Sequence, residues 1–440
     1  MPRTTRLIEL ASPVEKAFLI AVDTAADPGW SAEESLIELG ALAATAGAEV
    51  VGAEWQNRRQ VDPNWYFGKG RAEELREAKG ETGFTLLIAD DELSPNQQKA
   101  LETVLNVKVI DRSRLILDIF ALHAHTHEGR LQVELAQLEY QLPRLTRLWT
   151  HLSRTGGGIG TRGPGETQLE TDRRVIRERI KKMKERVEGI RQHREIAARA
   201  RDRRFLPTVA IVGYTNAGKS TMLNALAGAD AAYVADQLFA TLDPTSRQVR
   251  LGEGQAAIVT DTVGFIHKLP HQLIDAFRAT LEEVTRADTL LEVVDAFDPH
   301  FAEHRATVQT VLDELGAGAK PRVVAYNKAD LVEAAARDGE LPAPALGDAV
   351  LVSALTGYGL DTLRARLAAT LAELWDEVDV AIPYSAGELL ARVRERGNVE
   401  LSYRGRDVRV RGRLDPALAG ELTAVAAGWR GSARDGRRAT

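Results

Sequence analysis

Hydrophobic positions in the first part of the chain fall into short runs that alternate with amphipathic stretches. Each run is brief and mostly apolar, which is the pattern of a buried strand. Two of the intervening helical patterns have clear start signals: Ser31 precedes 32–46, and Ser94-Pro95 puts a proline in a first turn. Repeated β–α units of this length predict a small parallel sheet. The strand-like runs are 17–22, 50–53, 86–89 and 107–110, and a further helical pattern covers 116–122.

Two short motifs near this region are not predicted to carry chemistry. Residues 66–70 contain Gly-Lys-Gly but lack the spacing of a phosphate loop, so we predict a turn in a loop and no second nucleotide site. His123, His125 and His127 alternate, so on a helix only His123 and His127 would share a face. Surface histidines of this kind are commonly unliganded, and we favour that interpretation over a metal site.

The next segment, 123–204, contains two apolar stripes with steps of three and four residues. Such stripes predict an antiparallel coiled hairpin in which each helix buries the apolar face of the other. Between them, 154–165 is rich in glycine and includes Arg154 and Arg162, so we expect a basic, pliable tip. The stripes are Leu131, Leu135, Leu138, Leu142 and Leu145 in the first helix, and Ile176, Ile180, Met183, Val187 and Ile190 in the second.

Charge is concentrated in the same segment. The chain has a formal net charge of −6, yet 144–204 holds 18 lysines and arginines against 8 acidic residues. Arg173, Arg174 and Arg177 lie in the second helix with few acids nearby, which favours contact with a nucleic-acid backbone. A solvated helical spacer remains an alternative, because charge runs are usually solvated faces.

A glycine loop dominates the second half of the chain. It fits G-x-x-x-x-G-K-[ST], follows the apolar run 208–212 and precedes a helical pattern that begins at Thr221. This strand, loop and helix context predicts a phosphate site at which backbone N–H groups and the helix N-terminus bind the β-phosphate. Lys219 is expected to reach the β- and γ-phosphates, and the Ser220 hydroxyl to ligate Mg²⁺. The loop reads Gly213, Tyr214, Thr215, Asn216, Ala217, Gly218, Lys219 and Ser220.

Three later motifs, each at the end of a strand-like run, complete a nucleotide site. Asp261 ends one run and is positioned to hold Mg²⁺ through water, and the Gly264 N–H can bind the γ-phosphate. Asp330 can accept hydrogen bonds from both N1–H and the exocyclic amine of guanine. Adenine would leave that carboxylate unpaired, so the motif selects GTP. The base-binding loops are Asn327, Lys328 and Asp330, followed by Ser353, Ala354 and Leu355.

The segment between these motifs is expected to sense the γ-phosphate. We choose Thr241 as the threonine that completes the Mg²⁺ shell, with Thr245 as the alternative. A simpler interpretation is that both threonines only cap turns. Phe265 stands where many GTPases have a glutamine that orients water, so hydrolysis by the chain alone should be slow. Asn216 is a candidate K⁺ ligand, or it tolerates a turn conformation. The switch segment is Phe239, Ala240, Thr241 and Leu242.

Length and composition bound the architecture. At 440 residues the chain is expected to form several domains, and without cysteine it has no disulfide or thiolate site. We predict an α/β protein with an N-terminal parallel α/β domain at 1–122 (the first 14 residues loose), the antiparallel coiled α-hairpin at 123–204, a doubly wound P-loop GTPase domain at 205–374, and a small C-terminal α+β domain at 375–440 with a frayed end. The order in the last domain is β-α-β-β-α.

Together these motifs resemble the HflX family of ribosome-associated GTPases, in the Obg–HflX superfamily of TRAFAC-class P-loop GTPases. The resemblance covers nearly the full chain, and the glycine-rich stretch is its most specific element because general GTPases lack it. An apolar residue at Phe265 is also typical of the superfamily. The stretches that carry the likeness are 156–170, 239–245 and 261–265.

The resemblance implies a cytoplasmic GTPase that binds the large (50S) ribosomal subunit and splits or rescues stalled ribosomes under stress. Arg154 and Arg162 at the tip would contact 23S rRNA, and the ribosome would stimulate hydrolysis. Mg²⁺ is the implied metal, and the protein is expected to be a monomer without a membrane span, leaving peripheral membrane association open. Some members act on ATP through the N-terminal domain, but no motif for it is found. The alternative function is a GTP-dependent switch that recruits a protein through the hairpin.

Overall fold

The computed structural model describes residues 14–24, 30–145, 164–201, 206–228, 238–239, 241–252, 255–268, 278–331, 347–396, 398–414 and 416–435. The chain forms two compact units, and the boundary does not follow the order of the sequence. The first unit consists of Met1–Val187 and His267–Ala276, and the second of Glu188–Ile266 and Phe277–Thr440. The bounds of the four expected domains stay a prediction.

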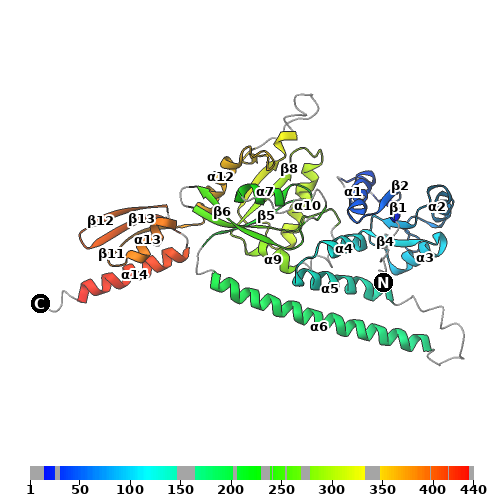
Figure 1. The fold of residues 1–440 in the computed structure, drawn as a ribbon, viewed down its shortest axis with the longest axis horizontal. Coiled ribbons are helices and arrows are strands. Elements are labelled where there is room, and N and C mark those ends of the chain that lie inside the picture. Colours follow the sequence, from blue (N-terminus) through cyan, green and yellow to red (C-terminus); the bar gives the residue numbers. More distant parts are fainter. Residues whose placement is uncertain are drawn as a thin grey trace, which may run out of the picture. The chain divides into compact units, whose positions relative to one another are not determined.

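The first unit is built on a four-stranded sheet in which every neighbouring pair is parallel, in the order β2-β1-β3-β4 (Figure 1). Phe18, Leu87 and Val109, each from a different strand, belong to one buried cluster. Side chains from the loops and helices that cover this face of the sheet complete the cluster. The expected parallel sheet is therefore confirmed. Its strands are β1 (Lys16–Asp23), β2 (Glu49–Asn57), β3 (Leu86–Ala89) and β4 (Lys108–Asp111).

Three of the four helices of this sheet begin at a side-chain N-cap, and α2 is the exception. Ser31 and Ser94 both form capping boxes, in which the serine side chain accepts from a backbone N–H of the first turn. In addition, the backbone N–H of Ser31 donates to the Glu34 side chain, and that of Ser94 donates to the Gln97 side chain. One helix, α2, was not predicted, because only its Ala72 and Leu75 are buried and its apolar stripe is weak. The helices are α1 (Ala32–Thr45), α2 (Lys69–Thr82), α3 (Pro95–Leu105) and α4 (Arg112–His123).

The structure corrects the expectation for 66–70. Tyr66 does close a tight turn, with reciprocal backbone hydrogen bonds to Asp62 and a φ of 68°. Gly68, however, is the N-cap of α2, and Lys69 and Gly70 form its first turn rather than a loop. The three histidines likewise do not share a helix, since α4 ends at His123 and the next helix begins at His127.

The two helices of the expected hairpin are present and run in opposite directions in Figure 1. They are α5 (His127–Arg144) and α6 (Pro164–Arg201), and the ion pairs Arg179–Glu134 and Lys184–Glu139 join them. Ile180 and Met183 are the buried part of the second stripe. The tip 154–165 lies outside the described residues except for the first two residues of α6, Pro164 and Gly165.

A six-stranded sheet forms the larger part of the second unit, in the order β10-β9-β8-β5-β7-β6. All neighbours are parallel except β6 and β7, which are antiparallel. The strands are β5 (Thr208–Val212), β6 (Thr245–Gly252), β7 (Gln255–Asp261), β8 (Thr289–Asp295), β9 (Arg322–Asn327) and β10 (Val350–Leu351). Around them lie α7 (Lys219–Ala227), α9 (Arg278–Arg286), α10 (Phe301–Glu314) and α12 (Leu360–Glu373).

The C-terminal segment has its own antiparallel sheet, in the order β11-β13-β12, with two helices. Ile382, Val393, Val408 and Leu422 belong to a separate buried core, which confirms the expected small β-α-β-β-α module. Its elements are β11 (Asp376–Pro383), α13 (Gly387–Arg396), β12 (Asn398–Arg404), β13 (Asp407–Leu414) and α14 (Pro416–Asp435). Among the described residues, none of the helices has the length and apolar character needed to cross a membrane.

Candidate functional site

The glycine loop connects β5 to α7 at the carboxyl edge of the six-stranded sheet. Gly213 has a φ of 153°, and an added Cβ there would lie 2.2 Å from the carbonyl oxygen of Val293 on β8. Gly218 has a φ of 90°, and a Cβ there would lie 2.3 Å from Asn327 Nδ2. Both glycines are therefore required by close neighbours as well as by backbone conformation.

Lys219 is the first residue of α7 and is buried. Its Nζ donates to the carbonyl oxygen of Tyr214 at 2.7 Å, which holds the ammonium over the loop. Burial lowers the pKa of Lys219 to about 8, against the opposing effect of the Asp261 carboxylate. The expected phosphate-binding lysine thus has a fixed position at the mouth of the loop.

Three oxygen-bearing side chains meet beside this lysine. Ser220 Oγ donates to Asp261 Oδ2 at 2.6 Å and lies 2.7 Å from Thr241 Oγ1. Asp261 Oδ1 is buried without a hydrogen-bond partner, and burial raises the pKa of the carboxyl despite its hydrogen bonds. The sequence-predicted metal residues are therefore brought together, and Thr241 rather than Thr245 joins them, since Thr245 begins β6 and is exposed.

The segment after Asp261 pairs with the glycine loop. Thr215 N–H donates to the Phe265 carbonyl at 2.8 Å, and Phe265 N–H donates to the Gly213 carbonyl at 3.1 Å. A Cβ at Gly264 would lie 2.8 Å from Lys219 Nζ, so this glycine packs directly on the lysine. The side chains of Phe265 and Ile266 are both apolar and buried.

The base-binding loops are tied to the glycine loop through Asn327. Its Nδ2 donates to the Ala217 carbonyl at 2.9 Å, and its Oδ1 accepts from the Ala354 N–H at 2.9 Å. Asp330 Oδ1 accepts from Ser353 Oγ at 2.5 Å, which orients the carboxylate. Lys328 forms an ion pair with Asp295 at 2.6 Å, whereas the side chain of Leu355 is exposed.

Other predicted residues lie around or away from this cluster. Asn216 is exposed with a φ of 58°, which fits either of its two interpretations. Thr221 is in the first turn of α7, and Phe239 and Leu242 are buried. Ala240, Arg154 and Arg162 lie outside the described residues, and Arg173, Arg174 and Arg177 are on α6, with Arg174 and Arg177 exposed.

Two contacts were missed from the sequence. His304 on α10 stacks on Tyr214 with ring centroids 3.8 Å apart, and the sequence offers no periodic signal for this pair. Lys268 makes two ion pairs, with Asp90 and Asp91, at 2.6 Å each. Their separation of 178 and 177 positions in the chain puts them beyond any local pattern.

The fold and these loops define a P-loop GTPase domain of the doubly wound class. Models of three families match the chain: "GTP-binding GTPase N-terminal" at 33–121, "GTP-binding GTPase Middle Region" at 123–201 and "50S ribosome-binding GTPase" at 208–328. A relative from Caldanaerobacter subterraneus subsp. tengcongensis, "GTPase HflX", is 49% identical over 391 residues, or 89% of each chain. "GTPase HflX" of Escherichia coli K12 is 42% identical over 85% of this chain and 88% of its own.

The chain therefore belongs to the HflX family of GTPases. A solved structure described as "SsGBP and GDP complex" is 26% identical, with a TM-score of 0.44 over 82% of this chain and 99% of that chain.

Proposed function

We propose that this chain binds GTP with Mg²⁺, hydrolyses it to GDP and phosphate, and acts on the large ribosomal subunit. The observation that carries the proposal is the cluster of Ser220, Thr241 and Asp261 beside Lys219. Two hydroxyls and a carboxylate with one unpaired buried oxygen are hard oxygen donors of the kind that Mg²⁺ prefers. Ser220 and Thr241 would bind the ion directly and Asp261 through water.

Each residue then has one task in the reaction. When bound, Mg²⁺ neutralises charge on the β- and γ-phosphate oxygens. Lys219 binds the same oxygens, and the Gly264 N–H binds the γ-phosphate and so reports its presence to the following segment. Asn327 links the base loop to the phosphate loop, and Asp330 recognises guanine. The remaining predicted contacts to phosphate, Gly213 through Thr221, are those of the loop and first helical turn.

Water activation is the incomplete step. Because Phe265 is buried and apolar, the chain offers no side chain at that position to orient the attacking water. We infer that the ribosome accelerates hydrolysis, and that Asn216 helps to hold K⁺ near the phosphates as a second source of positive charge. Comparing turnover in KCl and NaCl at equal ionic strength tests the ion, with Asn216→Ala expected to remove any K⁺ preference.

Two observations support the proposed action on the ribosome: the matched "50S ribosome-binding GTPase" model and the exposed arginines of α6. We propose that Arg174 and Arg177, with Arg173 and the tip residues Arg154 and Arg162, contact 23S rRNA, and that a cytoplasmic monomer splits or rescues stalled ribosomes under stress. Phosphate contacts make such binding fall steeply as salt rises.

GTP turnover with and without purified 50S subunits, at two salt concentrations, tests this function. We expect salt-sensitive stimulation that is lost when 154–165 is replaced by a short linker and weakened by Arg174→Gln with Arg177→Gln. Glu134→Gln with Arg179→Gln, which removes an ion pair between the helices, is the matched control. Stimulation that resists salt would favour a protein-docking hairpin, and no stimulation would overturn ribosome activation.

A further inference from the structure

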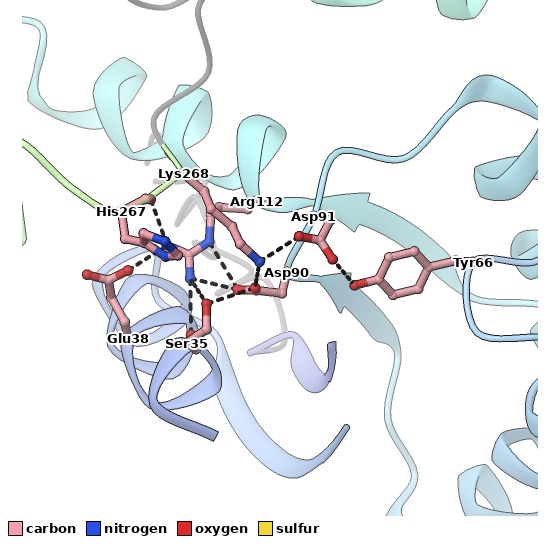
Figure 2. A network of polar contacts seen from close by, with 8 residues as sticks. All are labelled: Ser35, Glu38, Tyr66, Asp90, Asp91, Arg112, His267 and Lys268. Atoms are coloured by element: carbon pink, nitrogen blue, oxygen red, sulfur yellow. Dashed lines mark hydrogen bonds and ion pairs between the residues drawn. The ribbon is translucent and has the colours of Figure 1, made fainter. Parts of the chain in front are cut away.

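The carboxyl edge of the four-stranded sheet contains a buried polar network (Figure 2). Arg112, the first residue of α4, is 1% exposed and is held from several sides. Its Nη2 and Nε donate to Asp90 Oδ1 at 2.6 and 3.1 Å, and its Nη1 donates to Glu38 Oε2 at 2.6 Å. A second bond from Nη2 reaches the Ser35 carbonyl at 3.0 Å. The network therefore joins α1, β3 and α4 at one point.

This point is where an open α/β sheet ordinarily binds a ligand. The chain passes from β1 outward to β2 and then crosses back to β3, so the strand order reverses between β1 and β3. Ligands of such sheets bind in the crevice outside the carboxyl ends of the strands at that reversal. Asp90 and Asp91 directly follow β3 and put two carboxylates in that position.

The crevice is filled by the chain itself. Lys268 Nζ lies 2.6 Å from Asp90 Oδ2 and 2.6 Å from Asp91 Oδ1. The carbonyl of His267 accepts from Arg112 Nη1 at 3.2 Å, and the His267 ring stacks on Trp30 with centroids 4.5 Å apart. Figure 2 shows Lys268 pointing between the two aspartates. The dipeptide His267-Lys268 is thus held both by a backbone contact, at the His267 carbonyl, and by its side chains.

The two aspartates are arranged to bind a cation. Tyr66 O–H donates to Asp91 Oδ2 at 2.6 Å, which turns the other oxygen toward Lys268. Burial alone would raise the pKa of Asp90, but Arg112 and Lys268 outweigh it and lower that pKa to about 2. Burial acts to lower the pKa of Lys268, and the two aspartates instead raise it above its ordinary value. Both partners are therefore charged over the physiological range.

The bound dipeptide lies just beyond the γ-phosphate sensor. Lys268 is four positions after Gly264, and between them Phe265 pairs with the glycine loop through its N–H and carbonyl. Lys268 also has a φ of 54°, a left-handed conformation that costs a non-glycine residue free energy and persists only where its surroundings fix it. The ion pairs supply that fixation.

We propose that Lys268 is a positioning residue for GTP hydrolysis: bound by Asp90 and Asp91, it fixes Phe265 and Gly264 against the phosphate loop. The inference rests on the proposed function, because it assigns a new role in the same reaction. A buried ion pair often adds little stability compared with apolar packing, so its value here is in defining one arrangement. Without it, Gly264 would have to be ordered again in each turnover, and such ordering lowers the rate of the chemical step.

Steady-state GTP turnover of the full chain tests the proposal through Lys268→Met and Asp91→Asn. Met is unbranched like lysine, is one atom shorter, keeps the strain at this φ and removes the charge. We expect kcat to fall about fivefold to twentyfold in each, with KM for GTP within about twofold of wild type. Lys268→Arg should restore most of kcat, and the double variant should be no slower than Lys268→Met, because Asp91→Asn removes one of the two contacts that Lys268→Met already removes.

Two ion pairs of the same unit that lie outside this network, one exposed and one half-buried, provide matched controls. Lys108→Met removes the exposed Glu15 pair and Asp118→Asn the Arg114 pair, and both should leave kcat unchanged. Thermal melting checks that each variant is folded, and Asp91→Asn carries the test alone if Lys268→Met is not. Unchanged kcat in folded variants, increased kcat, or losses that multiply in the double variant would each overturn the positioning role. A wild-type chain that does not turn over GTP would instead overturn the proposed function.

Discussion

The two parallel sheets of this protein use the same edge in opposite ways. At the carboxyl edge of the six-stranded sheet, β5 leads into a glycine loop whose backbone N–H groups and Lys219 present positive charge. At the carboxyl edge of the four-stranded sheet, β3 leads into Asp90 and Asp91, which present negative charge. The first edge suits an exchangeable anion, whereas the second is filled by Lys268 of the same chain.

The difference shows how one architecture supports both a ligand site and an internal contact. In each sheet the strand ends gather polar groups from loops far apart in sequence. What decides the outcome is which residues follow the strand: glycines leave the backbone open to a phosphate, whereas carboxylates need a cation. Breaking each edge separately should therefore have separate consequences.

The largest effect is expected at the carboxyl edge of the six-stranded sheet, which suits an anion. Lys219→Met removes the ammonium that the Tyr214 carbonyl holds over the loop, so charge on the transferring phosphoryl group loses its nearest side-chain cation. We expect kcat for GTP to fall about 100-fold or more. Turnover under saturating GTP is the measurement, with Lys108→Met as the control. A loss smaller than about tenfold would mean that Lys219 does not contact the reacting phosphate.

Base selection gives the next effect in size. Asp330→Asn replaces a carboxylate that Ser353 orients at 2.5 Å, and the amide cannot accept both guanine donors. We expect the affinity for GDP to fall roughly 10- to 100-fold, matching about 1–3 kcal/mol for an unpaired charged hydrogen bond. The affinity for xanthine nucleotides should rise, because the xanthine carbonyl can accept a hydrogen bond from the new amide. Competition binding measures both, and an unchanged preference for guanine would contradict the assignment.

At the edge that carries Asp90 and Asp91, a further effect is expected on the free energy of unfolding. The pKa of Asp90 is lowered from 3.8 to about 2 in the folded chain, so its contribution is complete above pH 3.8 and is lost as pH falls toward 2. The difference corresponds to about 2 kcal/mol. Urea unfolding between pH 5 and 2 should show a shallower loss of stability in Asp90→Asn than in wild type, whereas Asp118→Asn should follow wild type. Parallel curves for Asp90→Asn and wild type would refute the buried pairing.

The smallest effect concerns the support of the glycine loop. The ring of His304 lies nearly parallel to that of Tyr214, with an interplanar angle of 10°, and Tyr214 carries the carbonyl that holds Lys219. His304→Ala should lower kcat by about twofold to fivefold, and His304→Phe should recover most of the loss because it keeps the stacked ring. Equal rates in the Ala and Phe variants would show that stacking does not support the loop.

Local chemistry explains why much of this could be predicted. The glycine loop and the serine caps of α1 and α3 depend on residues within a few positions of one another, and each was found from the sequence. The guanine motif is equally local and stays a prediction. Helix α2 escaped prediction because Ala72 and Leu75 are its only buried side chains, too few for a periodic signal. Element type follows local pattern only where burial repeats along one face.

Long-range pairing explains what could not be predicted. No pattern in the sequence near Lys268 predicts that Asp90 and Asp91 will bind it. The same holds for His304 on α10, whose partner Tyr214 is in the glycine loop. Motif spacing singled out residues that the structure places together at one sheet edge, but not the contacts that support them, because those contacts come from tertiary packing.

The distance between Asp90 and Lys268 along the chain also has a consequence for biosynthesis. Their separation is 178 residues, so at about 5–20 residues per second a ribosome adds the lysine roughly 10–35 seconds after the aspartate. During that interval the nascent N-terminal sheet has the carboxylates of Asp90 and Asp91 with Arg112 but without their second cation. Its charge balance is complete only after strands β5, β6 and β7 of the other unit have been translated, so the N-terminal sheet cannot complete this network until part of the second unit has been synthesised.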